Sequence, residues 1–116
     1  MRRRSPLRRS VIAAAALAAL LAAAAQAQPL AANVQKAAQI DPPKAAYVVV
    51  GDTPLYSVAA YDPDKMTGES LKRGQRPQVL GEASGGLWIL IGKGGAGIGY
   101  ASRSLLCPAN LCPDIR

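Results

Sequence analysis

The hydrophobic pattern is clearest between residues 71 and 101, where short apolar runs alternate with glycine clusters. The runs are Gln78–Leu80, Leu87–Ile91 and Ile98–Ala101. Glycine accepts the positive φ that tight turns require, so short apolar runs bounded by glycines predict strands joined by hairpin turns. The pattern therefore predicts an all-β fold.

Upstream, the chain has two more segments with strand character. Tyr47–Val50 is rich in β-branched residues and stops at Gly51, and Thr53–Val58 follows it. The next predicted strand is Arg76–Leu80, and its Pro77 indicates an edge or bulged position at that end. The intervening residues 59–70 are polar and are expected to form a long connection. The side chains that we expect in the core are Val48, Val50, Val79, Ile89, Ile91 and Ile98.

The run Leu87–Ile91 is apolar at every position, although successive side chains of a strand point to opposite faces. Alternation puts Leu87, Ile89 and Ile91 on one face and Trp88 and Leu90 on the other. A small domain has one interior, so the face with Trp88 and Leu90 is either covered by another segment or exposed. Either the N-terminal arm and residues 59–70 cover it, or it forms a shallow groove. We favour the groove, because the arm has few bulky side chains.

The first 27 residues have the layout of a cleaved signal peptide. An arginine-rich head precedes the uncharged run Val11–Ala25, and an A-x-A signal places cleavage between Ala27 and Gln28. The run is not apolar enough for a membrane-spanning helix, so we expect no stable membrane anchor after cleavage. The mature protein is then periplasmic or secreted. Residues 28–45 are expected to be a linker or weakly helical arm, loosely ordered and ended by Pro42-Pro43.

Charge and composition exclude several classes of function. Five arginines within the first nine residues contribute most of the net charge of +7. The rest of the chain has nine basic and seven acidic residues and is nearly neutral. We therefore expect no nucleic-acid partner. The chain has no histidine, which removes the commonest general base and the histidine metal ligands. We expect a protein that is not an enzyme and that needs no metal or other cofactor.

Acidic residues in the polar connection raise the question of calcium. Asp62, Asp64 and Glu69 lack the alternating oxygen ligands and the central glycine of an EF-hand loop. Solvated loop acids are the favoured interpretation.

Two cysteines, Cys107 and Cys112, lie in the tail formed by residues 107–116. In an exported protein an isolated pair of thiols predicts a disulfide. The alternatives are a redox pair, which usually spaces its cysteines by two residues, and half of a metal site, for which no second ligand pair exists.

A series of short motifs resembles the bacterial SH3-like domain, often written SH3b. The motifs, in order, are Lys72-Arg73-Gly74, Val79-Leu80-Gly81-Glu82, Gly86-x-Trp88-x-x-Ile91, Gly99-Tyr100 and Leu105. The resemblance implies a small SH3-like five-stranded barrel over residues 46–106. Residues 102–106 are similar to the short helical turn that closes such barrels.

The resemblance also implies where a ligand would bind. In SH3-like barrels aromatic side chains line one shallow groove, which here implies Tyr56, Tyr61, Trp88 and Tyr100. The protein would be a non-catalytic binding module of the bacterial cell envelope, recognising a peptide, a peptidoglycan fragment or an envelope protein. Alternatively, Trp88 and Tyr100 are packing residues, and the protein is a small structural or inhibitory periplasmic protein with no ligand groove.

We predict export followed by cleavage after Ala27, so that the mature protein begins at Gln28. Intact-mass and N-terminal peptide measurements on the envelope fraction check this. A cytoplasmic protein that retains residues 1–27 would contradict the prediction.

Overall fold

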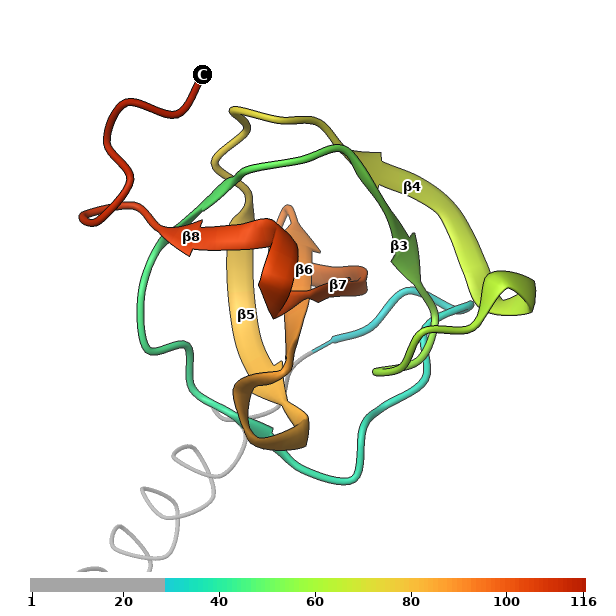
Figure 1. The fold of residues 1–116 in the computed structure, drawn as a ribbon. Coiled ribbons are helices and arrows are strands. Elements are labelled where there is room, and N and C mark those ends of the chain that lie inside the picture. Colours follow the sequence, from blue (N-terminus) through green and yellow to red (C-terminus); the bar gives the residue numbers. More distant parts are fainter. Residues whose placement is uncertain (1–28) are drawn as a thin grey trace, which may run out of the picture.

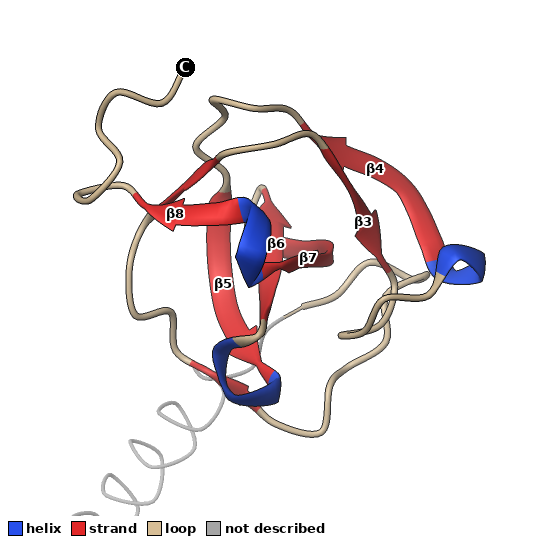
Figure 2. Cartoon of the chain, in the orientation of Figure 1, coloured by secondary structure: helices blue, strands red, loops and turns tan. Residues whose placement is uncertain are grey.

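The computed structural model describes residues 29–116, which form an all-β fold (Figures 1 and 2). The predicted signal peptide and its cleavage point at Ala27 and Gln28 lie outside the described residues. The strands are β1 (Ile40–Asp41), β2 (Tyr47–Val49), β3 (Thr53–Tyr56), β4 (Met66–Leu71), β5 (Gln78–Ala83), β6 (Trp88–Lys93), β7 (Ala96–Ser102) and β8 (Leu106–Pro108). Short 3-10 turns are η1 (Pro63–Lys65), η2 (Ser84–Gly86) and η3 (Arg103–Leu105). Over residues 29–116, no helix has the length and apolar character needed to cross a bilayer.

The strands form two antiparallel sheets. Six strands pair in the order β1-β5-β6-β7-β3-β4, and β2 pairs with β8 in a separate two-stranded sheet. Strands β1 and β4 are the two edges of the larger sheet and do not pair with each other. The expectation of a closed five-stranded barrel is therefore wrong in its detail, because the sheets do not close and the described residues contain eight strands.

The five predicted strands correspond to β2, β3, β5, β6 and β7, and the predicted helical turn corresponds to η3. Strands β1, β4 and β8 were not predicted. Most of β4 is exposed and polar in sequence, so its strand character comes from pairing with β3 rather than from an apolar pattern.

Apolar side chains pack on both faces of the larger sheet. The main cluster contains Tyr47, Val49, Leu55, Leu71, Ile89, Ile91, Ala101 and Leu106, with Val79 and Ile98 packed against it. Val48 is fully buried as well, and Val50 is half-buried. The second cluster contains Val34, Ala83, Leu90 and Tyr100, with Trp88 at its margin. Leu87 does not share the face of Ile89 and Ile91: it is 67% exposed, because β6 begins only at Trp88.

The N-terminal arm covers the second cluster. Residues 29–45 contain no helix, and they pair with β5 through β1. The arm contributes Leu30, Ala31, Val34, Ala37 and Ile40 to the second cluster. The prediction of a loosely ordered, weakly helical arm is therefore wrong, since burial of these side chains outweighs the helical preference of alanine.

Two glycines of the sheet allow the arm to approach closely. A Cβ at Gly97 would lie 2.7 Å from Leu30 Cδ2, and a Cβ at Gly81 would collide with Ile40 Cγ2. The backbone of Gly97 also bonds the arm, donating to Pro29 O over 2.8 Å and accepting from Ala31 N over 2.8 Å. A side chain at Gly81 would also meet the backbone oxygen of Asp41 at 2.9 Å and so push the arm away from the sheet, whereas one at Gly97 would require the Leu30 side chain to move.

Two buried polar side chains anchor the arm. The Tyr100 hydroxyl donates to Gln35 O over 2.8 Å and accepts from the Ala37 N–H over 3.1 Å. Glu82, only 3% exposed, accepts through Oε2 from the Lys44 N–H over 2.9 Å and from the Tyr47 hydroxyl over 3.0 Å. These bonds hold the middle and the end of the arm.

We expect Tyr100→Phe to lower the free energy of unfolding by about 1–2 kcal/mol, because both hydrogen bonds to the arm are lost. Urea unfolding measures the loss, and hydrogen exchange should show reduced protection of the Ala37 amide. Tyr61→Phe is the matched control, since Tyr61 is 73% exposed. If Tyr100→Phe changes neither quantity, side-chain packing alone holds the arm.

Candidate functional site

Three of the four predicted groove residues lie together. The ring centroids of Tyr56 and Tyr61 are 5.6 Å apart, and those of Tyr56 and Trp88 are 5.8 Å apart in an edge-to-face arrangement at 87°. We call Tyr56, Tyr61 and Trp88 the aromatic patch. Tyr56 is buried, Trp88 is half-buried and Tyr61 is 73% exposed. A ligand could therefore contact Tyr61 and part of Trp88, with Tyr56 supporting both.

Regular structure holds the two inner rings of the patch. Tyr56 lies opposite Tyr100 of β7 and Met66 of β4, and Trp88 lies between Ala83 and Ser102 in the sheet. Burial, followed by the neighbouring Tyr61, raises the pKa of Tyr56 above its usual value. This ring is thus a neutral phenol at physiological pH.

The loop that carries Tyr61 is tied back to the sheet. The Asp62 carboxylate accepts the N–H of Asp64 over 3.0 Å and caps η1. The Ser57 N–H bonds Lys65 O over 2.7 Å, across the base of the loop. Tyr61 is therefore exposed on a loop whose two ends are joined by hydrogen bonds.

Tyr100, the fourth predicted groove residue, is the cross-strand neighbour of Tyr56, but a ligand cannot reach it. It is fully buried beneath the arm, and both of its hydroxyl bonds go to arm backbone. Burial raises its pKa, an effect that the bond from Ala37 partly offsets. Leu90 is also fully buried under the arm. The expectation that the arm leaves this face open as a groove containing Tyr100 is wrong, because the arm occupies that face.

Met66 is a neighbour of the patch that the sequence did not single out. It is 50% exposed and lies opposite Tyr56 in the β3–β4 pair. The only sequence signal was one long apolar residue at the start of a polar stretch. Exposed methionine next to aromatic rings adds a flexible apolar surface.

The acidic residues of the loop do not converge on a metal-binding arrangement. Among residues 29–116, no group of three or more histidine, cysteine or acidic side chains is placed to hold an ion. Asp62 has a structural task, as the cap of η1.

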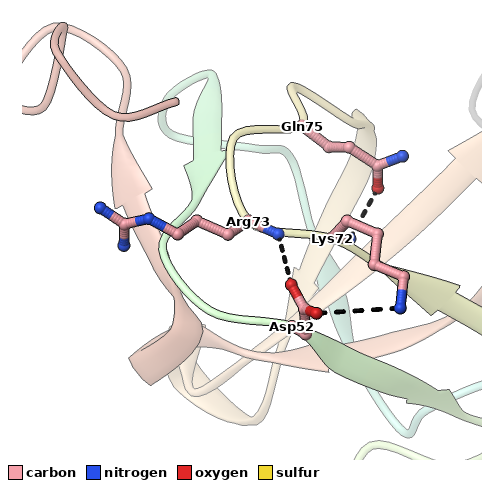
Figure 3. A network of polar contacts seen from close by, with 4 residues as sticks. All are labelled: Asp52, Lys72, Arg73 and Gln75. Atoms are coloured by element: carbon pink, nitrogen blue, oxygen red, sulfur yellow. Dashed lines mark hydrogen bonds and ion pairs between the residues drawn. The ribbon is translucent and has the colours of Figure 1, made fainter.

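A polar network holds the turn that follows β4 (Figure 3). Asp52 accepts from the Arg73 N–H over 2.8 Å and pairs with Lys72 Nζ at 3.8 Å. The Gln75 side chain accepts from the Lys72 N–H over 2.9 Å. The turn is also bonded to β2, through Gly74 N to Val49 O. These contacts fix the position of the turn relative to the β2–β3 corner.

The predicted disulfide between Cys107 and Cys112 is present. Cys107 lies in β8 opposite Val48 of β2, so the bond ties the tail to the two-stranded sheet. The first residue of the predicted tail thus belongs to a strand.

No family model, no curated protein and no solved structure matches this chain.

We expect reduction of the disulfide to lower the free energy of unfolding by about 2 kcal/mol, because the short loop loses its cross-link in the unfolded state. Urea unfolding with and without a thiol reductant measures this. The unreduced mature protein should contain no free thiol. The Cys107→Ser/Cys112→Ser variant, indifferent to reductant, is the control. Two free thiols in freshly purified protein would contradict the prediction.

Proposed function

We propose that this protein is a non-catalytic binding module of the bacterial cell envelope that binds its ligand through the aromatic patch. One observation carries the proposal: Tyr61 is exposed by 73% while its ring lies 5.6 Å from the buried Tyr56, which in turn packs against Trp88. Tyrosine and tryptophan combine a large apolar body with a polar tip, which makes them effective contact residues. A peptide, a peptidoglycan fragment or an envelope protein is the proposed ligand class.

The order of the elements supports an SH3-like assignment for residues 46–106. Strands β5, β6 and β7 form a meander, η3 follows, and β8 returns to pair with β2. The β3–β4 hairpin lies between the first strand and the meander, where SH3-like domains carry their long loop. In this comparison Tyr61 belongs to the long loop and Trp88 begins the strand after β5.

Two further features support an exported module without catalytic activity. A disulfide is typical of an oxidising compartment outside the cytoplasm. The lack of histidine in the sequence disfavours the common nucleophile–base pairs.

We expect Tyr61→Ala to weaken ligand binding at least tenfold while changing the free energy of unfolding by less than about 0.5 kcal/mol, because the ring is mostly solvated. Pull-down of the purified protein on isolated peptidoglycan, and on immobilised envelope extract, measures binding. Leu111→Ala is the matched control, because Leu111 is 71% exposed and belongs to the tail.

Trp88→Ala should also abolish binding, at a cost of about 1–2 kcal/mol in stability, below the ~3–5 expected for a fully buried tryptophan. Binding that survives both substitutions would contradict the role of the patch. Retention of a protein partner by both variants would favour the alternative of a structural or inhibitory protein.

A further inference from the structure

A cavity opens away from the aromatic patch, between β4 and the β6–β7 hairpin. Its volume is about 300 Å³, at the lower end of the range of roughly 300–1,000 Å³ that ligand pockets occupy. Its lining includes the apolar side chains of Leu71, Ile91 and Ile98 and the charged side chains of Glu69, Arg76 and Lys93. None of Tyr56, Tyr61, Trp88 or Tyr100 is among the lining residues.

The floor of this cavity is one end of the main apolar cluster. Leu71 and Ile91 are members of that cluster, and Ile98 packs against it. Because β4 is a sheet edge and does not pair with β5, the cluster ends here without a strand across it. An apolar group that entered the cavity would therefore extend the core.

The rim of the cavity carries an excess of positive charge. Arg76 and Lys93 come from different segments, and both are exposed. Within residues 29–116, neither the Arg76 nor the Lys93 side chain forms an ion pair or a hydrogen bond. The ion pair found there joins Lys72 to Asp52. Glu69 is the one acid of the rim. Arginine and lysine near an apolar floor match a carboxylate next to a hydrocarbon group.

Both sides of the rim are held in place before any ligand arrives. Gln75 belongs to the turn that the network around Asp52 fixes (Figure 3), and its carbonyl accepts from the Val49 N–H over 2.9 Å. On the other side, the Gln78 side chain accepts from the Gly95 N–H over 3.0 Å and steadies the hairpin that carries Lys93. Such preorganisation lowers the entropic cost of binding.

We propose that this cavity binds the C-terminal residue of a peptide with an apolar last side chain. The carboxylate lies between Arg76 and Lys93, and the side chain rests on Leu71, Ile91 and Ile98. A peptide is favoured over a smaller acid because the cavity borders β4, an edge strand whose outer side has no strand partner among residues 29–116. Edge strands can pair with an extended peptide through main-chain hydrogen bonds. The site is independent of the aromatic patch.

The test is a chemical-shift titration of the purified protein with the tripeptide acetyl-Ala-Ala-Leu. We expect saturable shifts at the backbone amides of Ser70, Ile91 and Lys93, with the Trp88 indole unmoved. The C-terminal amide of the same peptide should bind about tenfold more weakly, because it lacks the charged acceptor. N-acetyl-leucine, which has the same carboxylate and side chain without the peptide, should also bind more weakly.

Charge variants provide the second arm. Arg76→Gln/Lys93→Gln should weaken binding of acetyl-Ala-Ala-Leu about tenfold, whereas Lys36→Gln/Lys65→Gln, with the same change in net charge, should leave it unchanged. Unaltered amide spectra elsewhere in the variants show that the fold is retained. The proposal is overturned if the peptide causes no shifts at these amides, if acid and amide bind equally, or if both double variants weaken binding equally. Equal affinity for N-acetyl-leucine would overturn the peptide assignment.

Discussion

Strand β6 has apolar side chains on both of its faces, and both must be kept from water. Ile89 and Ile91 point into the main cluster, which the two-stranded sheet helps to close through Tyr47 and Leu106. Leu90 points the other way, where the folded meander has no further layer of its own. The N-terminal arm supplies that layer from within the chain. A domain this small has little interior, so a segment of extended chain takes the place that a second sheet or helix would take in a larger protein.

The sequence revealed those strands that have their own apolar pattern. The glycine-bounded runs correctly indicated β5, β6 and β7, and the valine-rich run indicated β2. Strand β1 has two residues and β4 is mostly polar, so both depend on the strands beside them and carry little local signal. The conformation of the arm also depends on contacts with other segments rather than on its local sequence. Its alanines suggested weak helix, but a helix would not have aligned Leu30 and Ile40 with the two glycines beneath them.

The sequence indicated which aromatic residues belong to the candidate site, but not how much of their surface is accessible. Alternation placed Trp88 and Leu90 on the same face, as observed, and the resemblance to SH3-like domains selected four aromatic residues. How much of that face the arm covers depends on its path in space, which no local pattern records. The arm buries Leu90 and Tyr100 and leaves Trp88 half-buried. Accessible aromatic surface is thus concentrated near Tyr61, on a loop.

The close approach of the arm at Gly81 and Gly97 has a consequence for how such proteins would diverge. The route of the arm depends on two places in the sheet where a side chain is missing, as well as on the arm's own apolar side chains. Substitutions in the arm that keep a modest apolar side chain over each glycine would be tolerated, whereas alanine at either glycine would meet arm atoms directly. Chains of this architecture could therefore differ widely over residues 29–45 and still share the spacing of these glycines within the meander.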